Sequence, residues 1–297
     1  PISEIPEQTA QVLASCHSLA QLDDGLVGDP LEKATLTAID WNMSRGDAVI
    51  PKRGKFKALK IYQRYHFSSS LKRMSVLAGY MQSYTGETHY IGSVKGAPET
   101  VMKMLKTIPP GYEETYLEYS RRGARVLALG IKEFGKLEHQ AVREMKREEV
   151  ERDLTFVGFV IISCPLKPDS KAIVKEIIQA AHKVVMITGD NPLTACHVAK
   201  ELRFTKKPIL VLTPNEDATK WQWQGIVGNI KVPIHGPHSK NIKEIIKEYD
   251  FCITGDGLIY LNDVDHDYLS DVLPYVTVFA RVAPKQKEFV ITTLKRL

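Results

Sequence analysis

Residues 183–192 read KVVMITGDNP, and this stretch decides the fold predicted for the second half of the chain. The Val/Ile-rich run at 183–187 predicts a buried strand, and Pro192 is a favoured first-turn residue of a helix. Thr188, Gly189 and Asp190 therefore lie in a turn from a strand to a helix. Such turns line the ligand-binding edge of a parallel sheet, and the N–H groups that open a helix suit a phosphoryl oxygen. The letters GD are also common in turns for conformational reasons alone, so the turn by itself leaves both interpretations open.

Strand and helix alternate on both sides of this turn. Alternation of this kind is typical of a mostly parallel, Rossmann-like sheet. Residues 213–240, which include Trp221 and Trp223, show no clear period, and we expect them to form a surface insertion. Helices are predicted at residues 171–182, 192–202 and 241–249 and after Pro284, and strands at 183–187, 208–212, 251–254 and 275–280.

The first half of the chain follows a different pattern. Aromatic and β-branched residues dominate its predicted strands, and turn residues separate them. Strands are predicted at 59–67, 74–84, 89–94, 125–130 and 154–162, and helices at 7–19, 29–43, 99–105 and 136–151. This pattern favours an antiparallel sheet flanked by helices, an α+β domain. The chain is therefore predicted to be an α/β protein of two domains, residues 1–162 and 163–297.

Composition excludes several classes of protein. Of 297 residues, 43% are hydrophobic and 25% charged, which is globular composition without a bias to disorder. The net charge is +5 and the charges are interspersed, so no nucleic-acid partner is expected. The four cysteines are far apart, which fits a reducing compartment, and the longest apolar run, at 156–162, is too short to cross a bilayer. The chain starts at Pro1 and ends within a predicted helix, so we expect it to be part of a longer protein.

Three stretches resemble functional motifs that they do not complete. Residues 130–137 approach a phosphate-binding Walker loop, but Leu137 stands where a magnesium-binding Ser or Thr is required. Residues 263–267 approach a calcium loop, but Tyr268 stands where Gly is required. Residues 97–99, APE, match part of the protein-kinase signature, but neither of its companion motifs, HRD and DFG, occurs in the sequence.

Six short motifs nevertheless occur in one particular order along the chain. In that order they resemble the nucleotide-binding domain and part of the haloacid-dehalogenase-type phosphorylation domain of P-type ATPases. Three segments, GDPLEK at 28–33, SCPLK at 163–167 and APKQKEF at 283–289, resemble the type V, subclass A pumps of the endoplasmic reticulum. Most other P-type pumps carry an Asp where Cys164 precedes Pro165. The six motifs are GDPLE at 28–32, FSSSLKRMS at 67–75, KGAPE at 95–99, RVLAL at 125–129, MITGDN at 186–191 and FARVAPKQK at 279–287.

In the first half, the resemblance implies an ATP site. Phe67 would offer its ring to adenine, a stacking interaction worth ~1–3 kcal/mol. From the residue alone, Phe67 is equally readily a core aromatic, and Lys72 and Lys95 are ordinary surface lysines. By resemblance the two lysines would bind the triphosphate. The other residues that the resemblance places at the nucleotide are Glu32, Met74, Gly96, Arg125 and Leu127.

In the second half, the resemblance implies residues close to the transferring phosphoryl group. Thr188 and Lys287 would act on that group in catalysis, while Gly189, Asp190 and Arg281 would lie at the nucleotide. Neither the family's DKTGT motif, which holds the aspartate nucleophile, nor its magnesium motif TGDGxND occurs in the sequence. The run TGDG at 254–257 matches only the start of the magnesium motif and is followed by LIY. No residue of the chain is therefore predicted as a metal ligand, and the Mg²⁺ that accompanies ATP would be held mostly by residues outside it.

The resemblance implies the ATP-binding part of an endoplasmic-reticulum P-type ATPase, facing the cytosol. The parent would form an aspartyl-phosphate and remove misinserted transmembrane helices, its cargo. Its partners would be its own actuator, phosphorylation and transmembrane parts, and the present chain would bind ATP without hydrolysing it. Two other functions stay open: a stand-alone haloacid-dehalogenase-like phosphatase that uses Asp263 and Asp265, and a regulatory ATP-sensing module.

Overall fold

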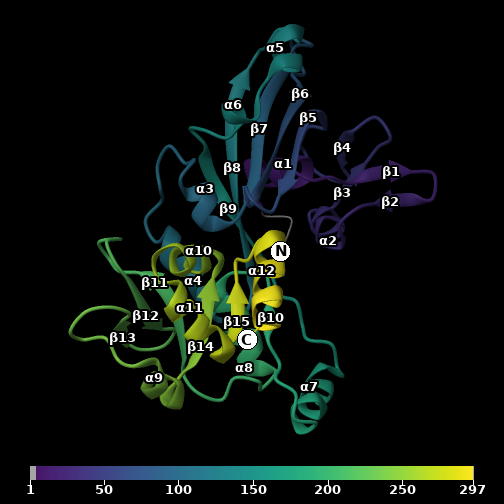
Figure 1. The fold of residues 1–297 in the computed structure, drawn as a ribbon. Helices are drawn as coiled ribbons and strands as arrows, with labels where there is room; N and C mark the ends of the chain where they lie inside the picture. The colour runs from purple at the N-terminus through teal and green to yellow at the C-terminus, as the bar shows by residue number, and fades with distance from the viewer. Residues whose placement is uncertain (1–4, 297) are drawn as a thin grey trace. The chain divides into compact units, whose positions relative to one another are not determined.

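The strands of residues 5–296, the part of the chain that the computed structural model describes, form a seven-stranded sheet, a six-stranded sheet and a two-stranded ribbon (Figure 1). The chain divides into two compact units. Residues 5–116 and Val126–Ile161 form the first, and Leu117–Arg125 and residues 162–296 form the second. Within residues 5–296, none of the helices combines the length and the apolar character that a bilayer crossing requires.

The first unit is built on the seven-stranded sheet, in which consecutive strands are neighbours. Each neighbouring pair from β3 to β8 is antiparallel, as predicted for this half. The strands are β3 (Trp41–Met43), β4 (Ala48–Pro51), β5 (Leu59–Ser68), β6 (Arg73–Met81), β7 (Thr88–Gly96), β8 (Arg125–Gly135) and β9 (Thr155–Ile162). Beside them, β1 (Ala20–Leu22) and β2 (Gly25–Val27) form the antiparallel ribbon.

Both faces of this sheet carry hydrophobic residues, which explains why β6 is buried almost throughout. Met74, Val76 and Ala78 join the core that includes α1 (Glu7–Ser15), while Leu77 joins a smaller cluster with Val142 of α5 (His139–Glu144). Successive side chains of a strand point to opposite faces, so adjacent β6 residues pack against different layers.

Two predicted helices of the first unit were wrong in extent. The helix expected at 136–151 is two helices, α5 and α6 (Arg147–Val150), because Met145, with ψ 123°, leaves the helical conformation and Lys146 is extended. The helix expected at 29–43 is α2 (Pro30–Ala38) followed by β3. Asp40 has a positive φ of 61° and turns the chain, and Trp41 and Met43 are then buried by pairing with β4. Tertiary pairing thus overrides the local helical spacing. The short α3 (Pro98–Met102) and α4 (Tyr112–Arg121) complete the helices that precede β8.

The second unit is built on the six-stranded sheet, ordered β10-β15-β14-β11-β12-β13. Its first four strands pair in parallel, whereas β12 and β13 add an antiparallel hairpin. The strands are β10 (Met186–Ile187), β11 (Ile209–Pro214), β12 (Trp221–Gly225), β13 (Lys231–Pro233), β14 (Asp250–Thr254) and β15 (Val276–Ala280). The helices are α7 (Ser170–Gln179), α8 (Pro192–Glu201), α9 (Ile242–Glu248), α10 (Gly255–Val264), α11 (His266–Val272) and α12 (Pro284–Leu294).

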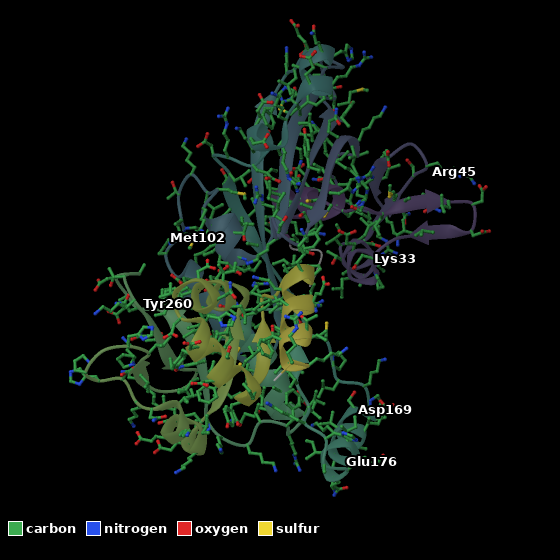
Figure 2. The ribbon with its side chains drawn as sticks, in the orientation of Figure 1. Lys33, Arg45, Met102, Asp169, Glu176 and Tyr260 are labelled. Carbon is green, nitrogen blue, oxygen red and sulfur yellow. The ribbon has the colours of Figure 1, made fainter. Side chains whose placement is uncertain are left out.

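Two predictions for this unit need correction. Residues 213–240 are not a surface insertion, because β12 and β13 extend the sheet and Trp223 is fully buried in its core. The strand predicted at 183–187 is reduced to Met186 and Ile187, the two residues that pair with β15. In Figure 2, α7 projects away from the sheet near the labelled Asp169 and Glu176, and it has no buried residue.

Candidate functional site

The turn between β5 and β6 carries the predicted adenine-stacking residue. Phe67, near the end of β5, is 61% exposed, which excludes the alternative that it is a core aromatic. The turn closes through backbone hydrogen bonds from the N–H groups of Leu71 and Lys72 to the carbonyl of Ser68, 3.1 and 2.7 Å long. Lys72 has a φ of 56°, a left-handed conformation that a non-glycine residue adopts at an energetic cost.

Gly96, at the end of β7, lies directly against this turn. The N–H of Ala97 donates to the carbonyl of Lys72 at 3.0 Å. A Cβ on Gly96 would lie 2.8 Å from the same carbonyl oxygen and 2.7 Å from the Arg73 Cβ. The absence of a side chain on Gly96 therefore lets the end of β7 approach the Lys72–Arg73 segment closely. Any larger residue would clash with this segment and separate β7 from the turn.

Lys95 forms a shielded ion pair with Glu32. The Nζ and Oε1 atoms are 3.0 Å apart, and the two side chains are only 12% and 13% exposed. Glu32 lies in the first turn of α2, the helix that the Asp29 side chain caps. Its carboxylate also accepts a hydrogen bond of 2.9 Å from the N–H of Ser18. The alternative that Lys95 is an ordinary surface lysine is thus excluded. Lys95 pairs in register with Met74, which is buried.

Cys16 and His17, which the sequence did not single out, lie next to this ion pair. Burial raises the pKa of Cys16 to about 12, and the thiol donates to the carbonyl of Met74 at 3.5 Å. Burial lowers the pKa of His17 to about 4, and its Nδ1 accepts from the N–H of Leu19 at 3.1 Å. At neutral pH both side chains are therefore uncharged, which makes neither of them suited to act as a nucleophile or a general acid. Both follow α1 directly, whereas the sequence predicted that this helix continues to residue 19 and so gave no signal for them.

In the second unit, Arg125 and Asp190 form a bidentate pair. The guanidinium Nε and one terminal nitrogen donate to the two carboxylate oxygens at 2.9 and 3.3 Å. Thr188 Oγ1 donates to Asp190 at 3.2 Å and accepts from the Asp190 N–H at 3.1 Å. The fork of Arg125 is thus engaged by a carboxylate, a group whose geometry resembles that of a phosphate.

The loop after β15 is attached to the Thr188 turn. The N–H groups of Arg281 and Val282 donate to the carbonyls of Asp190 and Thr188 at 2.9 and 3.1 Å. The Arg281 guanidinium donates to the carbonyl of Gly189 at 3.2 Å, and its backbone has a positive φ of 52°. These contacts bring together Arg125, Thr188, Gly189, Asp190 and Arg281 at the carboxyl edge of β10 and β15.

The remaining predicted residues, Lys287 and Leu127, lie near the starts of α12 and β8, one in each unit. Lys287 is half-buried in the first turns of α12, where its N–H donates to the carbonyl of Ala283 at 3.0 Å. Leu127 is half-buried on β8, next to Ala128, which pairs in register with Gly96.

Other acidic residues do not form a centre for chemistry. Asp265 follows α10, and its side chain accepts from the N–H of Tyr268 at 3.0 Å as the cap of α11, while Asp263 lies in the last turn of α10. Neither residue ends a strand, which disfavours the phosphatase alternative. No cluster of three or more His, Cys, Asp or Glu suited to a metal ion occurs among residues 5–296.

Comparison with known proteins identifies relatives along nearly the whole chain. Residues 8–169 match the family model described as "P-type ATPase, cytoplasmic domain N". The chain is 41% identical to a probable manganese-transporting ATPase of Arabidopsis thaliana over 294 residues. It is 40% and 38% identical to endoplasmic reticulum transmembrane helix translocases of Aspergillus fumigatus and Saccharomyces cerevisiae. Each alignment covers 99% of this chain but only 24% of the relative's own length.

Proposed function

The chain belongs to the P-type ATPase family, and we propose that it is the ATP-binding, cytosolic part of an endoplasmic-reticulum pump. The observation that carries this proposal is the exposed Phe67, presented on a turn that packs against the Lys95–Gly96 end of β7. An exposed aromatic face beside cationic side chains suits a purine nucleotide, because the ring stacks on the base while the lysines attract the phosphates. Glu32, Met74 and Leu127 complete this half of the proposed ATP site.

The second unit is proposed to be part of the haloacid-dehalogenase-type phosphorylation domain. Its parallel strands β10 and β15 end directly before Thr188 and Arg281. Ligands of such sheets bind at the carboxyl ends of the strands, so this edge is suited to a phosphoryl site. Thr188 would donate a hydrogen bond to the transferring phosphoryl group, and Lys287 would neutralise the charge that develops on it. Arg125, Gly189, Asp190 and Arg281 would lie at the nucleotide.

In the parent, the γ-phosphoryl of ATP would pass to an aspartate outside this chain, releasing ADP. Because two translocase relatives carry that function in their names, we propose that the parent likewise moves transmembrane helices out of the endoplasmic reticulum membrane. Its actuator and transmembrane parts would be the partners of the present chain. Mg²⁺ accompanies ATP in this chemistry, but no step is assigned to the metal through residues of this chain.

Replacing Phe67 with Ala tests the proposed ATP site. We expect the variant to weaken ATP by about one stacking interaction, ~1–3 kcal/mol, without unfolding, because the ring is mostly exposed. Calorimetric titration measures the affinity and circular dichroism the fold. Tyr84→Ala is the matched control, since Tyr84 is fully exposed on the turn between β6 and β7. A folded Phe67→Ala variant with unchanged ATP affinity would contradict the site.

A regulatory ATP-sensing module remains the second candidate, because the chain lacks the motif of the aspartate nucleophile. The two functions differ in the parent protein. A P-type ATPase retains ³²P from γ-labelled ATP covalently and loses it on treatment with hydroxylamine, whereas a sensing module binds ATP and retains no phosphate.

A further inference from the structure

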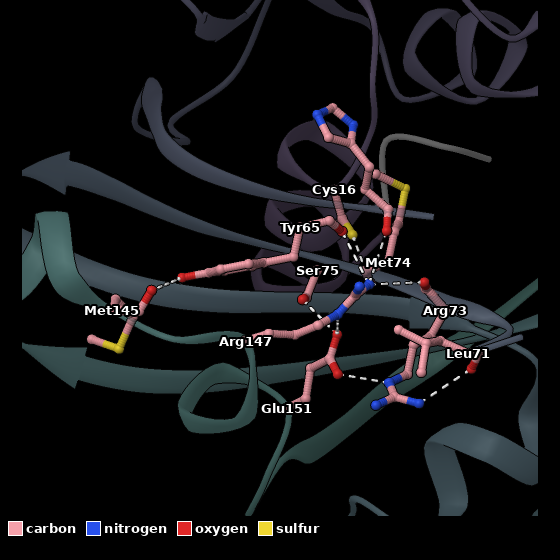
Figure 3. A network of polar contacts seen from close by, with 10 residues as sticks. Cys16, Tyr65, Leu71, Arg73, Met74, Ser75, Met145, Arg147 and Glu151 are labelled. Atoms are coloured by element: carbon pink, nitrogen blue, oxygen red, sulfur yellow. Dashed lines mark hydrogen bonds and ion pairs between the residues drawn. The ribbon is translucent and has the colours of Figure 1, made fainter. Parts of the chain in front are cut away.

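A buried polar network, which the sequence did not single out, joins α6 to the turn that carries Phe67 (Figure 3). Arg147 opens the single-turn helix α6 and Glu151 follows its end. The Nε of Arg147 donates to Glu151 Oε1 at 2.7 Å, and the two side chains are 19% and 3% exposed. We call Arg147, Glu151, Arg73 and Ser75 the Arg147–Glu151 network.

Arg147 binds the backbone of both arms of the hairpin. One terminal nitrogen donates to the carbonyls of Tyr65 and His66, at 3.2 and 3.0 Å, on the arm that leads to Phe67. The same nitrogen donates to the carbonyl of Arg73 at 3.1 Å, on the arm that leaves Lys72. One guanidinium group therefore spans the two strands at the position where they enter the turn.

Glu151 binds side chains of the second arm and, through Arg73, the turn itself. It accepts from Arg73 Nε at 2.6 Å and from Ser75 Oγ at 2.7 Å. Arg73 in turn donates to the carbonyl of Leu71 at 3.2 Å. Burial alone would raise the pKa of the Glu151 carboxyl, but hydrogen bonds from Arg147, Ser75 and Arg73 outweigh burial and hold that pKa below its ordinary value. The carboxylate thus stays charged and keeps its donors at neutral pH.

The turn held in this way has two features that need support. Phe67 is exposed, so little packing fixes its position, and Lys72 has a left-handed backbone conformation. A strained residue persists only where its surroundings determine the conformation, and a ligand site that is held in place before binding loses less entropy on binding. The network supplies this restraint from the protein side without reaching the exposed face of Phe67.

We infer that Arg147 and Glu151 are positioning residues for nucleotide binding, which hold residues 66–73 so that Phe67 and Lys72 are presented to ATP. This inference rests on the proposed ATP site. It assigns no contact between the network and the nucleotide, so the effect of a substitution must pass through the turn. Adenosine affinity should then fall because Phe67 moves with the turn, and ATP affinity should fall at least as much because Lys72 moves with it.

The substitution Arg147→Lys tests the inference in the full chain. Lysine keeps the positive charge beside Glu151 but lacks the planar fork that reaches the three carbonyls. We expect ATP and adenosine affinities to fall roughly three- to tenfold, because the competent conformation is less populated. Hydrogen exchange of the amides at 66–73 should accelerate, while exchange in β8 stays unchanged. In the Phe67→Ala background the same substitution should change adenosine affinity by less than about twofold, since its effect on this ligand acts through that ring.

Arg64→Lys is the matched control. Arg64 lies on the same strand, is 17% exposed, and pairs with Asp47 at 2.9 Å and with the carbonyl of His17, not with the turn. It should leave ATP affinity unchanged. If Arg147→Lys does not fold, Arg73→Lys replaces it, because this substitution removes the Nε bond to Glu151 and the bond to the Leu71 carbonyl.

The possible results separate the inference from the proposed function. Faster exchange at 66–73 with unchanged ATP affinity would overturn the positioning role. An equal loss of adenosine affinity in the presence and absence of the Phe67 ring would also overturn it. Loss of affinity in Arg64→Lys would show a general effect of sheet stability and would also overturn it. If Phe67→Ala alone leaves ATP affinity unchanged, the ATP site itself is wrong.

Discussion

At the residue scale, the two lysines of the proposed triphosphate site differ in their surroundings. Lys95 is shielded and paired with Glu32, whereas Lys72 is half-buried on the turn and forms no ion pair within the described residues 5–296. A phosphate that binds Lys95 therefore competes with a carboxylate already in place. Removing Lys95 would also leave the Glu32 carboxylate without its partner in a poorly solvated position, which is destabilising.

Lys72→Gln is consequently the cleaner test of phosphate binding. We expect it to weaken ATP more than adenosine, because the ammonium acts on phosphates, and to leave thermal stability nearly unchanged. Lys95→Gln should weaken ATP and also lower thermal stability. Parallel titrations with ATP and adenosine measure the difference, and the exposed Lys55→Gln serves as the control. Equal losses for both ligands in Lys72→Gln would indicate a structural role for this lysine.

His17 gives the first unit a predicted pH dependence. Burial lowers its pKa from 6.5 to about 4 in the folded state, so the unfolded chain takes up a proton between these values that the folded chain does not. The folded state is therefore not destabilised by His17 above pH 6.5, and its free energy of unfolding declines as the pH falls from 6.5 toward 4. From this shift we expect the free energy of unfolding to fall by about 2 kcal/mol between pH 7 and pH 5.

Hydrogen exchange of the β6 and β7 amides, corrected for the intrinsic pH dependence of exchange, measures this loss. His17→Gln should remove most of it, because glutamine does not titrate. His139→Gln is the control, since His139 is exposed on α5. The same pH dependence in wild type and His17→Gln would show that other groups cause it.

At the element scale, the hairpin of β12 and β13 is part of the core of the second unit. Trp223 is fully buried, meets the Phe251 ring edge-on at a centroid distance of 4.8 Å and donates from Nε1 to the Tyr268 hydroxyl at 2.8 Å. Trp221, two residues earlier, is half-buried and stacks on Tyr260, which Figure 2 labels on α10. Each tryptophan is followed by glutamine in the run WQWQ at 221–224, yet the two rings differ in burial.

Trp223→Ala should therefore destabilise the second unit by ~3–5 kcal/mol, because it leaves a large cavity. Trp221→Ala, the matched control, should cause a clearly smaller loss, since that ring is only partly buried. Urea unfolding of both variants measures the losses. Equal losses of unfolding free energy in the two variants would contradict the assignment of Trp223 to the core of the second unit.

At the scale of the whole molecule, the chain contains a proposed ATP site but not the motif of the aspartate nucleophile. Phosphoryl transfer requires an in-line nucleophile and positioned metal ions. We expect the chain to bind ATP without turnover, and Mg²⁺ to change its affinity for ATP little. A phosphate-release assay, with an intact P-type pump as positive control, checks this. Turnover above background, or ³²P retained on the purified chain, would mean that Asp256 or Asp263 performs chemistry that we have not assigned.

The sequence alone determined most elements and the family. The strands predicted at 59–67, 89–94, 251–254 and 275–280 are confirmed within a few residues, because alternation and turn residues are encoded within short windows. The order of six motifs predicted a P-type ATPase, and the family model matches residues 8–169. The residue at the proposed adenine site, Phe67, was also named from its motif.

Only the tertiary structure decided which side chains meet. Glu32 reaches Lys95 across 63 positions, and Arg73 reaches Glu151 across 78, so these pairs depend on strand register and on where α2 and α6 pack. The same long-range pairing turned residues 41–43 into a strand and placed the hairpin of β12 and β13 in the sheet. Local periodicity carries no information on such contacts, because their free energy comes from partners that are distant in the chain and buried together only on folding.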